Sequence, residues 1–415
     1  MFKRIKEEIR GFSKKELFFV FSAMACGFLI CAEYAVVRPV ANALFITSYS
    51  SSFLPYAWLV MVPLNFLVVF LYNRFLPRMG CLKMFLVIIT CVICGNIFSA
   101  LFLKTFHFLP FVFYVWKEIY ILLMFQQLWS VIHATIDTKR AKYIYGFLFG
   151  IGGLGGMCGS AIPGFFAVKF GSENLLFLSL PLYALLALGY ISLLRHSSMQ
   201  KERGLFTEGK EALVVLKGIR TTPILFFILL IVIFMQTSST VIDYQFNKLL
   251  EVTISTKDLR TEYTGKILGL INLCTTLLQF VGSFILLQFL GLKRTHFTIP
   301  FLLGMNALTF LFAPVFGVIS FSYITIKSCD FSIFGIIKEI LYIPLKPDEK
   351  FRAKAFIDVF AYRSAKAFAS IIILLFEAAL GASLAVTSLT WGVIVLCLLW
   401  SLTVLRLLKT EPRLA

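Results

Sequence analysis

Charged residues are scarce in this chain, and their scarcity excludes an ordinary water-soluble fold. Only 14% of its 415 residues are Asp, Glu, Lys or Arg, whereas 59% are hydrophobic and the mean hydropathy is +0.89. A typical soluble domain has about 45–50% apolar and about 25% charged residues. Apolar stretches long enough to cross a bilayer recur from end to end. We therefore expect one α-helical membrane domain, with no room for a large soluble one.

The motifs of common enzymes and metal sites are also missing. The chain contains no HExxH, no GxSxG and no Walker sequence, and its four histidines share no ligand spacing. Its nine cysteines lie mostly inside apolar stretches, where Cys91 and Cys94 form a CxxC only by chance. The sequence therefore predicts no catalytic residue, no metal, no cofactor and no enzymatic activity. A third hypothesis, an intramembrane enzyme or a non-transporting sensor, has no motif to support it.

A glycine-rich run from Gly150 to Gly164 formally matches the dinucleotide-binding pattern GxGxxG. The match lies within an apolar span rather than between a strand and a helix, so it does not indicate a dinucleotide site. Its small residues instead predict a helix face that packs closely against a neighbouring helix.

Hydropathy predicts about twelve membrane spans joined by short loops. The longest polar stretch, 195–222, lies at the midpoint and is expected to be a cytoplasmic linker between a six-helix bundle at 1–194 and a second one at 223–415. The predicted spans cover 16–37, 53–72, 81–103, 108–134, 143–168, 175–194, 223–246, 264–290, 296–316, 318–344, 355–380 and 385–405.

The basic residues predict the orientation of these spans. Lys and Arg are concentrated at the N-terminus and in the loops that alternate onto the same side of the membrane. Because short cytoplasmic loops are enriched in positive residues, we expect both termini in the cytoplasm of a bacterium and the protein in its inner membrane. This topology explains the net charge of +18 without a nucleic-acid partner. No clear cleavage site follows the basic N-terminus, so the first apolar run is expected to remain as a span.

An internal repeat supports two related halves. Glu33 and Arg38 in the first span are matched by Asp243 and Lys248 in the seventh, both at an offset of 210 residues. Further matches are Lys117-Glu118-Ile119-Tyr120 with Lys338-Glu339-Ile340-Leu341-Tyr342, and Arg140-Ala141-Lys142 with Arg352-Ala353-Lys354. The shared order of these matches predicts an all-α membrane fold of two parallel six-helix halves, as in the major facilitator superfamily.

Ionisable residues within the spans indicate a polar cavity. A charged group at mid-membrane costs about 3 kcal/mol on insertion scales unless it meets water or a partner. Arg38, Arg363 and Lys366 suggest an anionic substrate, because basic groups bind carboxylate or phosphate. Other ionisable residues in or near the spans are Glu33, Lys117, Glu118, Asp243, Lys327, Asp330, Lys338, Glu339, Asp358 and Glu377.

One segment resembles a known family. The run from Lys338 to Leu345, KEILYIPL, is similar to a block of the ATP/ADP translocases of obligate intracellular bacteria and plastids. The similarity continues through Asp348-Glu349-Lys350, Ala353-Lys354-Ala355, Ile357-Asp358-Val359, Arg363 and Lys366. Fainter echoes are Val37-Arg38 through Ala43-Leu44, Glu118, Arg140 through Tyr145, and Asp243.

The resemblance implies exchange of ATP for ADP, or uptake of a related nucleotide, by alternating access without hydrolysis. It also implies that Glu118, Asp243 and Lys366 are charged groups needed for transport. The expected partners are a small anionic substrate and the lipid bilayer, and we expect a monomer. The predicted substrate-binding and transport residues are Arg38, Glu118, Asp243, Glu339, Asp358, Arg363 and Lys366.

A second hypothesis is a proton-coupled carrier of another organic anion. It is motivated by Ala41, which stands where the family has a lysine in its first span. Glu118 or Asp243 would then be the proton site. The sequence leaves the identity of the nucleotide or anion, the coupling ion and the direction of net flux open.

Overall fold

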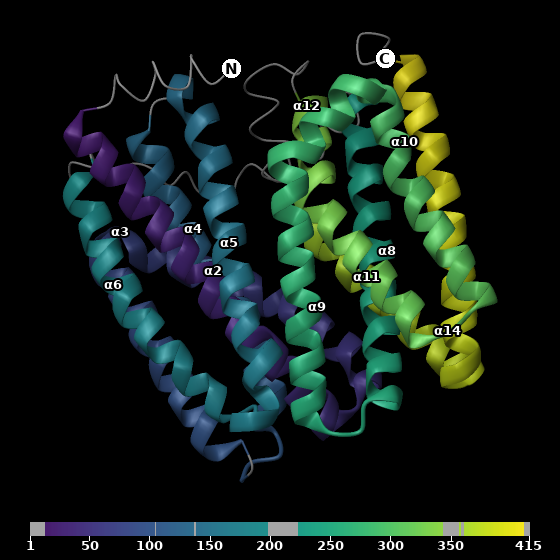
Figure 1. The fold of residues 1–415 in the computed structure, drawn as a ribbon, viewed down its shortest axis with the longest axis horizontal. Helices are drawn as coiled ribbons and strands as arrows, with labels where there is room; N and C mark the ends of the chain where they lie inside the picture. Colours follow the sequence, from purple (N-terminus) through teal and green to yellow (C-terminus); the bar gives the residue numbers. More distant parts are fainter. Residues whose placement is uncertain are drawn as a thin grey trace. The chain divides into compact units, whose positions relative to one another are not determined.

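The computed structural model describes residues 13–103, 105–136, 138–197, 223–342, 357 and 361–410, and in these ranges it contains helices and no strand. Figure 1 shows the chain as a set of long helices, with the α-helices labelled. The helices include two short 3-10 elements, η1 and η2, and two π-helical ones, η3 and η4. In chain order they are α2 (Lys14–Tyr49), η1 (Ser51–Phe53), α3 (Leu54–Phe102), α4 (Leu109–Thr135), α5 (Thr138–Phe170), η2 (Asn174–Leu178), α6 (Ser179–His196), α8 (Pro223–Thr253), α9 (Lys257–Leu277), η3 (Leu278–Gly282), α10 (Ser283–Phe312), α11 (Phe316–Cys329), η4 (Asp330–Phe334), α12 (Gly335–Leu341) and α14 (Tyr362–Thr410).

Nine helical stretches within the described ranges are long and apolar enough to cross a membrane. The expectation of a polytopic α-helical membrane protein is therefore confirmed, while the count of twelve spans stays a prediction. The first helix is longer than predicted, because α2 continues past Val37 to Tyr49 through a run of buried residues. The predicted spans 53–72 and 81–103 lie within one element, α3, which bends at Gly80.

Positive-φ glycines mark the bends and one helix end. Gly80, Gly291 and Gly381 have φ between 70° and 75° with ψ between 162° and 167°, and Gly171 directly after α5 has φ 81°. The first three lie in a backbone region that is essentially restricted to glycine. Gly80 and Gly291 are 211 residues apart, and Gly171 and Gly381 are 210 apart. These spacings agree with the offset of the repeat in the sequence.

Replacement of Gly381 should test this conformational requirement. No atom lies within 4 Å of a Cβ placed there, so strain from the backbone is the expected effect of Gly381→Ala, about 1–3 kcal/mol of lost stability. Gly392 in the same helix also has open space around it and no positive φ, so Gly392→Ala should be neutral or stabilising. Apparent melting temperatures of the detergent-solubilised variants, followed by tryptophan fluorescence, check this. Equal values for the two variants would contradict it.

The described residues form two compact units. Unit 1 comprises the residues up to Tyr49, Pro63 to 197 and Ile254–Thr276. Unit 2 comprises Ser50–Val62, residues 223 to Thr253, and the residues from Leu277 onward. Each unit thus consists mainly of one half of the sequence and includes a segment from the other. The predicted boundaries at 194 and 223 stay a prediction, and most of the predicted linker lies outside the described residues.

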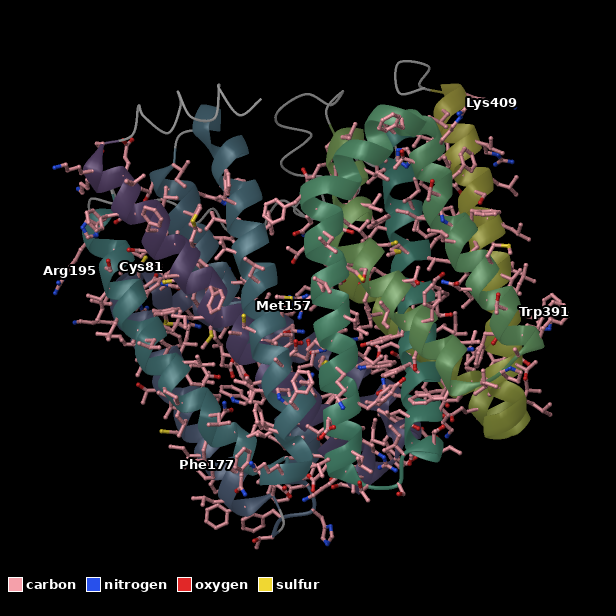
Figure 2. All side chains as sticks on the ribbon, viewed as in Figure 1. Cys81, Met157, Phe177, Arg195, Trp391 and Lys409 are labelled. Atoms are coloured by element: carbon pink, nitrogen blue, oxygen red, sulfur yellow. The ribbon has the colours of Figure 1, made fainter. Side chains whose placement is uncertain are left out.

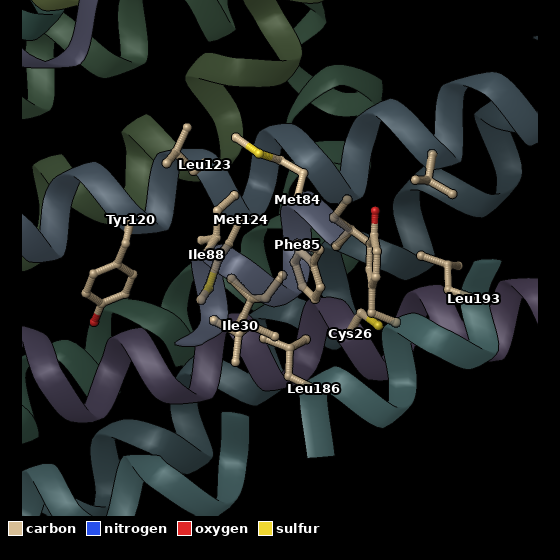
Figure 3. Close-up of a cluster of buried hydrophobic side chains, with 14 of the residues drawn as sticks. Cys26, Ile30, Met84, Phe85, Ile88, Tyr120, Leu123, Met124, Leu186 and Leu193 are labelled. Carbon is tan, nitrogen blue, oxygen red and sulfur yellow. The ribbon is translucent and has the colours of Figure 1, made fainter. Parts of the chain in front are cut away.

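Unit 1 is organised around α2, which packs against α4, α5 and α6. Nearly all of its residues between Ala32 and Ile46 are buried, which is typical of a helix within a bundle. Figure 3 shows part of the core beside it, including Ile30 of α2 and Phe85 of α3. Phe85 stacks on Tyr190 of α6 with ring centroids 3.7 Å apart. Lipid tails are as apolar as these side chains, so close packing rather than escape from water stabilises this core.

The glycines of α5 permit close contact with α2. A Cβ on Gly155 or Gly159 would collide with the backbone of Phe28 or Ala32 on α2. The predicted small-residue packing face is therefore confirmed at these two positions.

Unit 2 is built around α8, which packs against α14 and α11. Phe246 of α8 stacks on Tyr323 of α11, with ring centroids 4.4 Å apart and planes 3° apart. Helix α10 packs against α14 and α11. The contacts place α8 at the centre of its unit, as α2 is in unit 1.

Large apolar side chains cover the outer faces of the helices. Trp391, Phe312 and Phe289 are among those more than half exposed, and Figure 2 shows Trp391 projecting outward. Exposed apolar surface on this scale fits contact with lipid. The charged side chains that could form a functional site are therefore expected inside each unit.

Candidate functional site

In unit 1 the charged side chains of α2 and α4 meet through Tyr34. The Tyr34 hydroxyl donates to Glu118 Oε1 at 2.8 Å, and Lys117 Nζ donates to the same oxygen at 2.6 Å. The Arg38 guanidinium lies 5.9 Å from the centroid of the Tyr34 ring. Two predicted site residues, Arg38 and Glu118, are thus brought together with Tyr34 and Lys117 between them. Glu118 and Arg38 are half-buried, whereas Lys117 is fully buried.

Lys117 is held on its other side by an aromatic ring. Its ammonium lies 4.2 Å from the centroid of the Tyr114 ring, within the range of a cation–π interaction. A buried ammonium without such partners would be costly within a membrane. Lys117 therefore helps to fix Glu118 in place.

Glu33, next to Tyr34, occupies a different environment on α2. Its side chain is buried, and its Oε1 accepts a hydrogen bond from the Tyr120 hydroxyl at 2.9 Å. Figure 3 shows Tyr120 reaching toward α2. Asn96 Nδ2 donates to the hydroxyl of Tyr183 at 3.2 Å in the same buried region. No charged side chain pairs with Glu33 among the residues described.

In unit 2 a buried ion pair joins α8 to α11. Lys327 Nζ lies 3.2 Å from Asp243 Oδ2 and donates to the Ser239 hydroxyl at 2.9 Å. Asn247 Nδ2 donates to Asp243 Oδ1 at 2.8 Å. The predicted site residue Asp243 is therefore a fixed carboxylate with a cation beside it.

A second acid of unit 2, Asp330, lies one helical turn after Lys327. Asp330 is buried at the start of η4 and accepts hydrogen bonds from Gln236 Nε2 at 3.1 and 3.2 Å and from the Tyr362 hydroxyl at 3.1 Å. A π-helical segment inside a helix often occurs at a functional site, because it redirects side chains locally. The donors Gln236 and Tyr362 come from α8 and α14, so this acid links three helices.

The predicted basic residues Arg363 and Lys366 lie one turn apart at the beginning of α14, and both are half-buried. The Lys366 ammonium lies 4.8 Å from the centroid of the buried Trp58 ring. Spacing of three residues places Arg363 and Lys366 on one face of the helix. Both can therefore present positive charge to the same anion.

Two predicted site residues are not part of these clusters. Glu339 is exposed on α12. Asp358 lies outside the described residues. Neither residue therefore receives support from the contacts described above.

A further polar network in unit 2 lies at η1, directly before α3. Ser52 donates to Glu377 Oε1 at 2.9 Å and accepts a hydrogen bond from Lys248 Nζ at 2.6 Å. Glu251 accepts hydrogen bonds from the Ser51 backbone N–H at 2.8 Å and the Ser50 hydroxyl at 3.0 Å. These contacts join residues 50–52 of the first sequence half to helices of the second.

Unit 1 contains the corresponding contacts of the other segment. The Ser172 backbone N–H donates to Asp258 Oδ1 at 2.8 Å, and Arg260 Nη1 donates to the Thr47 hydroxyl at 3.1 Å. Lys257 forms an ion pair with Glu173. In both units, therefore, polar contacts join residues from the two halves of the sequence.

Lys327 is one of the ionisable residues of the predicted spans but is not among the predicted site residues. Its partner Asp243 aligns with Glu33 at an offset of 210, and Lys327 aligns with Lys117 at the same offset. Applying this single offset would have found the pair. The repeat read from the sequence instead pairs Lys117 with Lys338, which lies on the short helix α12.

Part of the chain is similar in sequence to a known transporter family. A sequence model of the TLC ATP/ADP transporter family matches residues 270–410. The chain is a membrane transporter. The matched stretch includes Lys327, Arg363 and Lys366, and it confirms the resemblance to ATP/ADP translocases drawn from the sequence.

Solved structures show the fold of the transporter. A mutant of the nucleoside transporter NupG aligns with a TM-score of 0.68 and 9% identity, covering 94% of this chain and 99% of NupG. A POT family transporter in complex with 5-aminolevulinic acid has a TM-score of 0.67 and 12% identity, covering 94% and 96%. A D-xylose-proton symporter has a TM-score of 0.66 and 13% identity, covering 94% and 97%. A search of curated proteins found no match.

Proposed function

We propose that this transporter moves nucleotides, by exchange of ATP and ADP or of a related nucleotide, through alternating access in a bacterial inner membrane. The observation that carries the proposal is the family match over the segment that contains Arg363 and Lys366. Basic side chains on one helix face are suited to bind a polyphosphate, and arginine can bind phosphate oxygens bidentately. In unit 1, Arg38 is a separate candidate for a phosphate contact.

We also propose that the transporter has twelve membrane spans. The nine candidate spans include one stretch, Ser51–Phe102, that is long enough for two spans and bends at Gly80. Dividing that stretch at Gly80 adds one span to the nine. Two more spans are the continuous helical stretch from Lys257 to Gly291 and the stretch Phe316–Leu341. With these additions the proposed count is twelve.

Two related halves are supported by the positions that recur at an offset of 210 or 211. They include two pairs of positive-φ glycines and the acids Glu33 and Asp243 on the central helices of the two units. Lys117 and Lys327 recur at the same offset on α4 and α11. Related halves that each carry buried charges are the basis of alternating access in many carriers.

The polar contacts between sequence halves fit a gate. Residues 47–52, 172–173 and 248–260 lie in or beside loops that the positive-inside rule assigns to the side away from the cytoplasm. Hydrogen bonds and ion pairs join these segments across the two sequence halves. In alternating access, contacts between the two halves form and break as each side of the carrier closes and opens. We therefore propose that these hydrogen bonds and ion pairs close the side away from the cytoplasm.

Uptake assays test the proposed function. The chain is expressed in a heterologous bacterial host, and uptake of labelled ATP, ADP, other nucleotides and nucleosides is measured with excess unlabelled competitors. The proposal expects accumulation of at least one nucleotide and competition by its relatives. The nucleotide proposal fails if none accumulates or competes while the protein is present in the membrane.

The alternative is a proton-coupled carrier of another organic anion. Ala41 favours it, because Ala41 is fully buried in an apolar cluster with Val40, Leu44 and Phe113 and supplies no cation to a substrate. Uptake of an organic anion that collapses with an uncoupler and needs no counter-nucleotide would favour this alternative.

A further inference from the structure

The carboxyl group of Glu33 has an incomplete set of hydrogen bonds. The residue is 1% exposed, and its Oε1 accepts a hydrogen bond from the Tyr120 hydroxyl. Its Oε2 is buried and has no hydrogen-bond partner among the described residues. Buried polar atoms without partners are costly, so this oxygen requires an explanation.

A second acceptor without a donor lies in the same buried region. Asn96 is fully buried, and its Nδ2 donates to Ser179 and Tyr183. Its Oδ1 has no partner within the described ranges. Asn96 and Tyr183 lie close enough to Glu33 to interact with its carboxyl group. Two buried acceptors in one region thus have no donor, and a proton on Glu33 would add the hydrogen-bond donor that this region lacks.

The charged groups around Glu33 are engaged elsewhere. On α4, Lys117 donates to Glu118 and lies over Tyr114. On α2 itself, Tyr34 donates to Glu118, and Arg38 lies over the Tyr34 ring. The titratable groups beside the carboxyl are the hydroxyls of Tyr120 on α4 and Tyr183 on α6. In α5 the glycine-rich stretch against α2 has Cys158 as its titratable residue, and this cysteine is exposed.

Asp243, the acid at the equivalent position of the second half, differs from Glu33 because it forms an ion pair. Asp243 lies 210 residues after Glu33 and has the Lys327 ammonium 3.2 Å away. Glu33 makes no ion pair within the part of the chain that the structure describes. An unpaired carboxylate inside a membrane protein is far more costly than the neutral acid, so a group in this position retains its proton.

We propose that Glu33 is a proton-binding site of the transporter, and that it releases and rebinds one proton during each transport cycle. In the described state the buried Oε2 carries the proton, while Oε1 accepts from the Tyr120 hydroxyl. Tyr120 lies on α4, the helix that also carries Lys117 and Glu118, so a substrate that displaces this pair and moves α4 also moves the Tyr120 hydroxyl away from Oε1. Water that then reaches Oε2 takes up the proton. This inference rests on the proposed transport function.

Infrared spectroscopy tests the protonation state without any substrate. The reconstituted wild type at neutral pH should show a protonated carboxyl C=O band that is absent from Glu33→Gln, and the band should shift in heavy water. Glutamine keeps the size of the side chain, and size-exclusion chromatography checks that the variant is folded. If wild type and Glu33→Gln give the same carboxyl spectrum, Glu33 carries no proton and the proposal is wrong.

Transport in proteoliposomes tests whether this proton moves. A pH gradient should drive substrate accumulation by the wild type, and Glu33→Gln should lose this driven accumulation while retaining exchange at equal pH. Glu262→Gln, which alters an acid in a partly exposed pair with Lys266, should behave like the wild type. Wild-type accumulation that ignores the gradient, or a Glu33→Gln variant that still responds to it, overturns the proposal. The two failures are distinguishable, because a carboxyl band without any nucleotide flux refutes the nucleotide as substrate, whereas a missing band refutes the protonated Glu33.

Discussion

Removing the Lys327 ammonium should destabilise the transporter by about 3–5 kcal/mol, the range measured when one partner of a buried ion pair is deleted. In Lys327→Ala the Asp243 carboxylate loses the cation 3.2 Å away, and the Ser239 hydroxyl loses a donor. Both charged side chains are less than 15% exposed, so water cannot replace the ammonium well. The expected result is a marked fall in the apparent melting temperature of the detergent-solubilised protein, together with loss of transport.

Two further variants separate charge from packing. Lys327→Ala combined with Asp243→Asn removes both charges and should recover most of the lost stability, because no uncompensated carboxylate remains. Lys266→Ala deletes a lysine from a partly exposed pair with Glu262, where about 1 kcal/mol or less is expected. If Lys327→Ala melts at the same temperature as Lys266→Ala, the Lys327–Asp243 pair does not hold α8 to α11.

Lys366→Ala and Arg38→Ala should each weaken transport of nucleotides while leaving membrane insertion intact. A charged hydrogen bond contributes about 1.5–3 kcal/mol, so loss of one phosphate contact should raise the half-saturating concentration of ATP or ADP roughly ten- to hundredfold. The effect should be larger for nucleotides than for nucleosides, which lack phosphate. Lys366 and Arg38 are half-buried beside aromatic rings, so their removal affects a local site rather than a core.

Competition of labelled ADP uptake by unlabelled nucleotides measures this effect, with the amount of protein in the membrane as the reference. Lys366→Arg keeps the positive charge and should retain more transport than Lys366→Ala. Normal transport by both alanine variants would show that these charges are structural.

The sequence predicted the class of fold because hydropathy reports directly on the solvent that surrounds a helix. The glycine face of α5 was also predictable, since small residues are needed wherever helix backbones approach closely. The buried charges were predictable as a group because each needs a partner within the membrane. These predictions depend on local composition, and the structure agrees with them.

Contacts between distant segments could not be predicted in the same way. Nothing in the sequence near Ser51 or Asp258 indicates that residues 50–62 pack with unit 2 and that residues 254–276 pack with unit 1. Likewise, Glu33 and Asp243 are equivalent in the sequence, yet only Asp243 has a lysine beside it. The difference arises because Lys117 pairs with its neighbour Glu118, and the residue after Lys327 is Ser328.

Resemblance to a family motif also did not predict the position of Glu339 in the structure. It lies in the part of the sequence that most resembles the family, but its side chain is exposed on α12. Ala41 is buried in apolar packing, so a lysine introduced there would place a charge in the core of unit 1. Position within a motif therefore did not determine which side chains line a polar site.

Nucleotide exchange in proteoliposomes tests the central claim most directly. Purified transporter is reconstituted into vesicles loaded with unlabelled ADP, and entry of labelled ATP or ADP is compared with entry into empty vesicles and into vesicles that contain Lys366→Ala. The account predicts that internal ADP stimulates entry of label and that Lys366→Ala reduces this stimulation. Entry that is the same with and without internal nucleotide, across all nucleotides tested, would contradict exchange of nucleotides by this protein.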